Sequence, residues 1–295
     1  MLVLLFFLFV FSVVLMSCSN NSGDQERQRP NIIWIYADDH DQKAISTYGE
    51  SRIETPNIDR IANEGMVFAN SFVSNSICSP ARAVVLTGKF SHMNGVKDNK
   101  IQFDSAQQTF PKILRGSGYQ TALVGKWHLR STPSVFDYWN KLPGQGNYYD
   151  PVFIENGDTL HTEGYVTDII TDFALDFLKN KRDTDKPFCL MVQNKAPHGP
   201  WMPAPRHLSL FANETFPLAE HFYHDCSQRG TPACEQDMEI YKKFSERHTL
   251  AKLYDKERGE IQGEQWLTWR YSLLDPDEQA QFDRVLTGEP ADVLG

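Results

Sequence analysis

Three short apolar segments, each followed directly by polar residues, constrain most strongly how this chain can fold. They are NIIWIYADDHD, which begins at residue 31, GYQTALVGKWHL, which begins at 118, and PFCLMVQNKAPHGPW, which begins at 187. Runs that are apolar on both faces are typical of strands in a parallel sheet covered by helices on both sides. Helical segments alternate with them along the chain, and this order predicts an α/β fold with a mostly parallel central sheet flanked by helices.

The same patterns predict where individual helices and strands lie. Thr55-Pro56-Asn57 opens a helix that ends at Gly65, and a short helix that contains Pro80 in its first turn ends near Gly88. The other expected elements are a central strand over 32–37, a strand over 66–73, a helix and then a strand within 109–129, an amphipathic helix over 167–181, a strand before residue 194 and a helix over 235–259.

Polar side chains follow the ends of three of these strands. They belong to Asp38-Asp39, Lys126 with His128, and His198. In open α/β sheets, ligands bind outside the carboxyl ends of the strands. The sequence therefore predicts that carboxylate, lysine and histidine side chains from distant parts of the chain meet in a single site.

The segment SNSICSPARAVVLTGK, which begins at residue 74, adds a cysteine to this set. Cys78 lies at the start of the expected helix, and Arg82 follows four residues later, so the two face the same way on a helical turn. The free N–H groups at a helix N-terminus favour an anion, and the arginine adds a permanent positive charge. From this stretch alone, a buried cysteine beside a surface arginine is an equally good interpretation.

The N-terminal residues predict export of the protein. Residues 2–16 are almost wholly apolar, and the run is shorter than a membrane span and suits the core of a signal peptide. The run ends in Leu-Met-Ser-Cys, which resembles a bacterial lipobox with Cys18 as the lipid-bearing residue; the alternative is an ordinary cleaved signal with an incidental cysteine. We expect a lipoprotein-type signal peptide over 1–18, a polar tether over 19–30, and a periplasmic or cell-surface location.

The remaining cysteines and the overall charge narrow the function further. Cys189 lies in an apolar run and is expected to be an inert core thiol, whereas Cys226 and Cys234, eight residues apart, could form a disulfide. The sequence lacks a CxxC pair, which argues against a structural zinc site. The net charge of −9 argues against nucleic acid as a partner but allows an anionic substrate in a local cationic pocket.

Taken together, these motifs resemble the type I sulfatases. CSPAR matches the family's C-x-P-x-R signature, RPNIIWIYADDH resembles its first strand with two acidic residues, and TPNIDRIANEGMVFANSFV resembles the segment before the signature. GYQTALVGKWHL carries a matching Lys-x-His pair, and APHGPW carries a later histidine. The resemblance covers about residues 30–210 and implies that 31–295 is the N-terminal part of a sulfatase catalytic domain with an alkaline-phosphatase-like fold.

The resemblance also implies the modification and the metal. Cys78 would be oxidised to formylglycine by a formylglycine-generating enzyme or an anaerobic maturase. Asp38, Asp39 and the modified Cys78 would be ligands of Ca²⁺, which takes about six to eight oxygen ligands. An aldehyde hydrate at position 78 would attack sulfur with one hydroxyl and release sulfate with the help of the other, as in covalent catalysis.

Four further residues receive roles from the same resemblance. Arg82 would hold the formylglycine side chain, and Lys126 would contact the sulfate. His128 would accept a proton as sulfate is released, and His198 would protonate the leaving sugar oxygen. A pKa near neutrality suits histidine to both tasks.

The later part of the sequence departs from the family. The family's second pair of metal ligands, in S-D-N-G or S-D-Q-G, has no counterpart after residue 210, so we expect a form of the domain truncated at its C-terminus. The local sequences most resemble N-acetylglucosamine-6-sulfatases and mucin-desulfating enzymes, which implies glycosaminoglycan or mucin chains as substrates. The alternatives are a phosphonate or phosphate monoester hydrolase of the same fold, a non-catalytic lipoprotein that binds sulfated glycans, and an inactive fragment.

Overall fold

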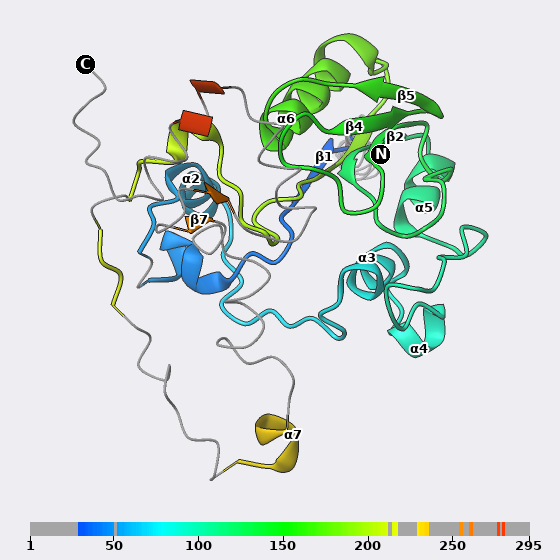
Figure 1. The fold of residues 1–295 in the computed structure, drawn as a ribbon. Coiled ribbons are helices and arrows are strands. Elements are labelled where there is room, and N and C mark those ends of the chain that lie inside the picture. Colours follow the sequence, from blue (N-terminus) through cyan, green and yellow to red (C-terminus); the bar gives the residue numbers. More distant parts are fainter. Residues whose placement is uncertain are drawn as a thin grey trace, which may run out of the picture. The chain divides into compact units, whose positions relative to one another are not determined.

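A six-stranded sheet organises the part of the chain that the structure describes (Figure 1). The strands are β1 (Ile32–Tyr36), β2 (Gln120–Lys126), β3 (Tyr138–Leu142), β4 (Val152–Glu155), β5 (Asp158–His161) and β6 (Phe188–Gln193). Their order across the sheet is β1-β6-β2-β3-β4-β5. The first four neighbours pair in parallel, and β4 and β5 add an antiparallel hairpin at one edge. The predicted mostly parallel sheet is confirmed.

The computed structural model describes residues 29–49, 52–211, 214–217, 229–235, 254–255, 260–261, 276–277 and 279–280. The chain divides into two units, Met1–Asn31 and Ile32–Gly295, and the fold described here belongs to the second. The expected signal peptide and most of the expected tether lie outside the described residues and stay predictions. Among the residues described, no helix has both the length and the apolar character that crossing a membrane would require.

Along the chain, most of the helices come between strands, which is the order expected of an α/β fold. The α-helices are α2 (Pro56–Glu64), α3 (Cys78–Thr87), α4 (Ser91–Asn94), α5 (Phe110–Gly116), α6 (Val166–Asp176) and α7 (Thr231–Cys234). Short 3-10 turns cover η1 (Gln42–Ala44), η2 (Ser46–Tyr48) and η4 (Pro205–His207), and a π-helical turn, η3 (Phe177–Lys181), continues α6. Two further short strands, β7 (Tyr254–Asp255) and β8 (Glu260–Ile261), pair antiparallel with each other.

The sheet has a core on each face. Successive residues of β2 and β6 point to opposite faces, and all positions of β6 are buried, as are all positions of β2 except the first. On one face, Ala122 and Val124 pack with α6 and η3. On the other face, Leu123 packs with α3. This burial on both faces explains why both strands read as continuous apolar runs in the sequence.

Two predicted strands differ from the observed fold. The run over 32–37 was expected at the centre of the sheet, but β1 is the edge strand of the described sheet and pairs only with β6 there. The three middle residues of β1 are exposed, with Ile33 at 50% and Ile35 at 63%. The run over 66–73 contains no strand, and Phe72 within it is 92% exposed. An apolar run indicates that a segment favours a strand, but it does not specify the neighbouring strands with which the segment would have to pair.

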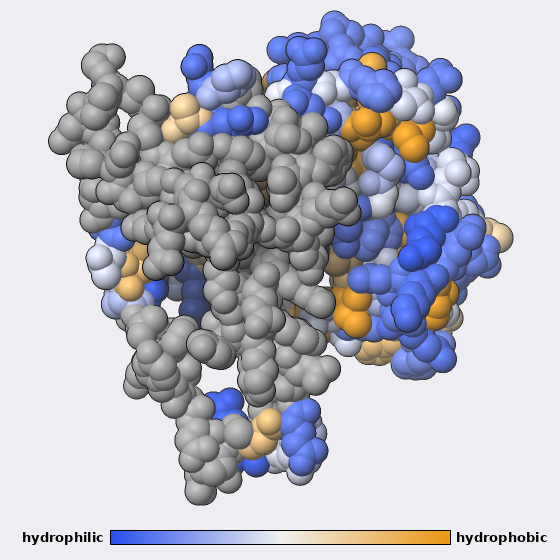
Figure 2. Space-filling view, viewed as in Figure 1, coloured by the Kyte–Doolittle hydropathy of each residue, from blue (hydrophilic) through white to orange (hydrophobic). Residues whose placement is uncertain are grey.

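Other expectations are confirmed or fall outside the described residues. The helices that were expected to end at Gly65 and near Gly88 correspond to α2 and α3. The helix expected over 167–181 corresponds to α6 and the π-helical turn η3 that continues it. Most of the helix expected over 235–259 lies outside the described residues, and Tyr254–Asp255 within it is a strand. Figure 2 shows that the described surface is largely hydrophilic, with apolar patches between the polar areas.

Candidate active site

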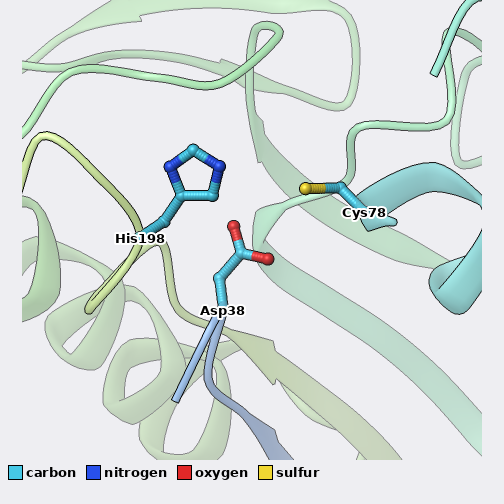
Figure 3. Close-up of side chains that lie close together, drawn as sticks. All are labelled: Asp38, Cys78 and His198. Carbon is cyan, nitrogen blue, oxygen red and sulfur yellow. The ribbon is translucent and has the colours of Figure 1, made fainter. Parts of the chain in front are cut away.

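Four segments that are far apart in the sequence meet at one end of the sheet. Asp38 follows β1, Lys126 ends β2, His198 lies in the loop after β6, and Cys78 is the first residue of α3. Because β1, β6 and β2 are parallel neighbours, their carboxyl ends lie at the same end of the sheet. The ligand atoms of Asp38, Cys78 and His198 all lie within 4.8 Å of one another. Figure 3 shows the Asp38 carboxylate between the thiol and the imidazole ring.

Asp38 is a buried carboxylate held between two cations. Only 4% of the residue is exposed, and its Oδ1 lies 3.3 Å from Nη2 of Arg82. Its Oδ2 accepts a hydrogen bond from Nζ of Lys126, and its backbone N–H donates to the carbonyl of Ala196 at 3.2 Å. Burial alone would raise the pKa of this carboxyl, but the charges of Arg82 and Lys126 hold it below its ordinary value. Asp38 is therefore ionised at neutral pH.

Arg82 connects the helix to the ends of the strands. The residue is 3% exposed, so the alternative of a surface arginine is wrong. Its Nη1 donates to the backbone carbonyl of Lys126 and, at 2.5 Å, to Oε1 of Gln193. Its guanidinium also lies 5.1 Å from the ring centroid of Tyr36. These contacts and the ion pair with Asp38 fix the guanidinium one helical turn beyond Cys78.

Cys78 is a half-buried free thiol at the N-terminus of α3. Burial raises its pKa above the ordinary thiol value, and the positive charge of Lys126 opposes this effect without overcoming it. An unmodified Cys78 is therefore protonated at neutral pH, and a protonated thiol is a poor nucleophile. Burial raises the pKa of Cys189 to about 11, in line with the predicted inert core thiol. Cys234 is disulfide-bonded, and Cys226, with which the sequence indicated that it could pair, lies outside the described residues.

His128 is half-buried and close to the positive charges of Lys126 and Arg82. Its backbone has a left-handed φ of 52°, a conformation that costs a non-glycine residue about 1–3 kcal/mol and is common at functional sites. Its carbonyl accepts a hydrogen bond from Oγ of Ser79 at 2.5 Å, and its buried Nδ1 has no hydrogen-bond partner among the described residues. Burial, with the charges of Lys126 and Arg82, lowers its pKa to about 4. At pH 7 the ring is therefore neutral, and it is a weaker base than the near-neutral pKa expected from the sequence would make it.

His198 presents one ring nitrogen to the site. Its Nδ1 donates to the carbonyl of Gly199 at 2.7 Å, which leaves Nε2 directed toward Asp39, whose Oδ2 lies 3.6 Å away. Burial and the charge of Lys126 lower the pKa of His198, whereas the Gly199 carbonyl and the two aspartates favour the protonated form. Asp39 itself is more exposed, at 57% of its side chain, and has a left-handed φ of 61°.

The structure thus brings all the predicted site residues to one place, with Asp39 at its rim. It also adds residues that the sequence did not single out. Gln193 ends β6 and is 3% exposed, and Oδ1 of Asn99 accepts from the backbone N–H of Ser79 at 2.9 Å. The position of Gln193 at a strand end was a usable signal. Asn99 lies in an irregular segment that carried no such signal.

The fold and the site together define a class of protein. Two buried cations, a helix N-terminus and two histidines lie at the carboxyl ends of parallel strands, which suits binding and chemistry of an anionic group. Residues 30–254 match the family model described as Sulfatase, and the chain belongs to the sulfatase family. Sulfatases generally use formylglycine and a metal ion, and Asp38, Cys78 and His198 form a triad that could hold one.

Characterised relatives support this assignment and refine it. The chain is 52% identical over 244 residues to an N-acetylglucosamine-6-O-sulfatase of Bacteroides thetaiotaomicron, a match that covers 82% of this chain and 42% of the relative. It is 31% identical over 220 residues to an N-acetylglucosamine-6-sulfatase of Homo sapiens, covering 66% of this chain and 39% of the relative. The chain therefore spans about two fifths of the length of the curated relatives that it matches.

A solved structure confirms the alkaline-phosphatase-like sulfatase fold. The structure of BT4656 in complex with its substrate D-glucosamine-2-N,6-O-disulfate matches with a TM-score of 0.80 and 47% sequence identity. The match covers 88% of this chain and 52% of that chain. The sheet order and the site described above thus belong to a fold that is known to accommodate a sulfated sugar in a related protein.

Proposed function

We propose that this protein hydrolyses sulfate esters of sulfated glycans, and that 6-O-sulfated N-acetylglucosamine is the sugar it desulfates. The observation that carries the proposal is the meeting of Asp38, Cys78 and His198 within 4.8 Å, beside the buried cations Arg82 and Lys126. The relatives named as N-acetylglucosamine-6-sulfatases support the choice of sugar. Glycosaminoglycan and mucin chains contain this group and are the substrate class we infer.

The electrostatics of the site favour a sulfate group. Arg82 and Lys126 supply two positive charges and Asp38 supplies one negative charge, so these three groups leave one positive charge in excess. The N-terminus of α3 adds the partial positive charge of its backbone N–H groups. Because Arg82 and Lys126 are almost fully buried, they attract an anion far more strongly than surface cations would.

The residues present fit the two groups that the family implies. Oxidised to formylglycine, residue 78 would supply a hydrate with two hydroxyls, one to attack sulfur and one to allow sulfate release. The unmodified triad offers oxygen, sulfur and nitrogen, a mixed donor set that does not suit Ca²⁺. With an oxygen at residue 78, that residue, Asp38 and Asp39 would provide oxygen donors for part of a calcium shell, and the ion would offset charge on the sulfate.

The histidines would move the protons. His128 is neutral at pH 7 because its pKa is about 4, so its ring is free of a proton and is the group that would accept the one leaving residue 78, although a pKa this low makes it a weaker base than an ordinary histidine. His198 has its Nδ1 committed to the carbonyl of Gly199, so Nε2 is the nitrogen that would carry a proton to the sugar oxygen. Burial and the charge of Lys126 lower the pKa of His198, and the Asp39 carboxylate, 3.6 Å from Nε2, acts against this by favouring the protonated form.

We also propose that the protein is exported and anchored by a lipid at Cys18. The apolar run over residues 2–16 and the Leu-Met-Ser-Cys ending support this location. In an exported protein, Cys78 would meet a formylglycine-generating enzyme or an anaerobic maturase before folding. Metabolic labelling with a fatty-acid analogue tests the anchor, because the label should enter the wild-type protein and be lost in Cys18→Ser. Equal labelling of both proteins would refute the anchor at Cys18.

Mass spectrometry and a substrate panel test the catalytic proposal. After expression with a maturing enzyme, the peptide that spans Cys78 should carry formylglycine, and the protein should release sulfate from N-acetylglucosamine 6-sulfate. Cys78→Ala should abolish release, whereas Cys189→Ala, which changes the other free cysteine described, should retain it. Faster cleavage of a phosphonate monoester than of the sulfate ester would assign a phosphonate hydrolase instead. An unmodified Cys78 in a fully active protein would refute the role of formylglycine.

A further inference from the structure

The loop that carries His198 is fastened by three tyrosine hydroxyls. This loop runs from Asn194, after β6, to Ala204, before η4, and has no regular secondary structure. Tyr148 donates to the carbonyl of His198. Tyr165 donates to the carbonyl of Met202 at 3.0 Å, and Tyr149 donates to the carbonyl of Pro203 at 2.6 Å. Buried carbonyl groups outside helices and sheets need such partners, and here side chains provide them.

The tyrosines form a rigid support because their rings are packed in the core. Tyr148 is 1% exposed and Tyr149 is 4% exposed, and both belong to the same apolar cluster as α6. The ring of Tyr165 stacks on that of Tyr148 with centroids 5.9 Å apart. The backbone also joins them, since Tyr149 and Tyr165 form a β-bridge. We name Tyr148, Tyr149 and Tyr165 the tyrosine clamp.

Within the clamp, Tyr148 contacts the residue that bears the proposed proton donor. Its hydroxyl fixes the backbone carbonyl of His198, which also accepts from the N–H of Trp201 at 3.4 Å. The ammonium group of Lys195, three residues before His198, lies 4.7 Å from the ring centroid of Tyr148. Tyr148 therefore contacts the loop on both sides of the turn that presents the imidazole ring. Tyr149 acts farther along, five residues beyond His198, and Tyr165 acts four residues beyond it.

We propose that Tyr148 is a positioning residue that holds Nε2 of His198 where it protonates the departing sugar oxygen. This inference rests on the proposed function, because it concerns the leaving-group side of sulfate ester cleavage. Proton transfer in a transition state requires the donor within hydrogen-bonding distance, and misplacement by about 1 Å can cost about a hundredfold in rate. A sugar alkoxide is a poor leaving group and needs that proton, whereas an activated phenolate does not.

The leaving-group dependence separates positioning from a general structural role. Tyr148→Phe removes one hydroxyl and keeps the packed ring, and Tyr149→Phe is the matched control because it removes the same kind of hydrogen bond from the same loop. We expect Tyr148→Phe to lower kcat about tenfold or more on N-acetylglucosamine 6-sulfate and less than about twofold on 4-nitrophenyl sulfate. Tyr149→Phe should leave the ratio of the two kcat values unchanged. Equal losses on both substrates, or an equal shift of the ratio in Tyr149→Phe, would overturn the inference.

A second measurement keeps this test separate from that of the proposed function. In ¹⁵N-histidine-labelled protein, Tyr148→Phe should shift the ring resonances of His198, identified by their loss in His198→Gln, and leave those of His128 in place. A wild-type protein without activity on either sulfate would refute the proposed function, and the His198 resonances would still test the positioning. Unchanged His198 resonances in Tyr148→Phe would overturn the positioning role whatever the substrate.

Discussion

Replacing Gly125 with alanine tests how closely β2 and β6 must approach at the end of the sheet where the site lies. A Cβ atom at this position would lie 2.0 Å from the backbone oxygen of Gln193 and 2.9 Å from its carbonyl carbon. Because the obstacle is the backbone of the neighbouring strand, no side-chain rotation can relieve it. The end of β6 would have to move by about 1 Å or more to reach ordinary packing distances.

The expected cost follows from two separate effects. Gly125 has a φ of +104°, and a non-glycine residue in such a conformation costs about 1–3 kcal/mol. Displacing Gln193 would also disrupt its pairing with Gly125, at about 1 kcal/mol for each hydrogen bond lost. Gly157 offers a matched control because its φ is +115° and nothing lies within 4 Å of its Cβ position. Gly157→Ala therefore carries the backbone strain without the collision.

Urea denaturation of both variants measures the difference. We expect Gly125→Ala to lower the free energy of unfolding by at least about 2 kcal/mol more than Gly157→Ala, which corresponds to a Tm lower by about 4–8 °C. Oε1 of Gln193 accepts a hydrogen bond from Arg82, so a displaced Gln193 would also displace Arg82 in the site. Folded Gly125→Ala should therefore lose sulfatase activity, whereas Gly157→Ala should keep it. Equal unfolding midpoints for the two variants would refute the reasoning.

Three further substitutions test the charges and the nucleophile. Asp38→Asn leaves the two buried cations that flank it without a carboxylate, so urea titration should reveal a loss of about 3 kcal/mol. Cys78→Ser lacks the second hydroxyl of a hydrate and should stall after one sulfuryl transfer; steady multiple turnover in a product assay would contradict this mechanism. Burial would raise the pKa of Glu155, but hydrogen bonds from Lys181 and Tyr138 lower it, so its stabilisation is present above its ordinary pKa and disappears as the pH falls through the lowered value. Glu155→Gln should accordingly cost less than about 1 kcal/mol at pH 7 and almost nothing near pH 2, and an equal cost at both pH values would exclude the ion pair as its cause.

The buried strands and the residues at their ends could be predicted from the sequence. β2 and β6 are covered on both faces, so their continuous apolar composition was enough to predict that they are buried strands inside the sheet. The start of α3 was also predictable because Pro80 and Gly88 mark its ends, and Gly88 adopts a left-handed φ of 66° as a C-terminal cap. The carboxyl ends of parallel strands and the starts of the following helices lie at the same end of the sheet. Local sequence patterns were therefore sufficient to predict a shared site.

Features that depend on distant partners were missed. The position of β1 at the edge of the described sheet depends on which other strands pair with it, and its own residues do not encode this. By contrast, the hairpin of β4 and β5 was missed although its signal is local. It turns at Asn156-Gly157, a pair of residues that strongly favours such turns. The hydrogen bond from Tyr148 to His198 joins residues 50 positions apart. A tyrosine at 148 gives no sign of that partner, because its ring alone suits the core equally well.

Arg82 explains why separate strand ends form one site. Its guanidinium donates to the carbonyl of Lys126 on β2 and to Gln193 on β6, and it forms an ion pair with Asp38 beyond β1. A planar group with five donors can reach three partners in different directions, whereas the single ammonium of a lysine is a compact charge. Because Arg82 lies one helical turn after Cys78, the contacts that join the three strands also fix the start of α3. The spacing of cysteine and arginine in CSPAR therefore determines where residue 78 stands relative to all three strands.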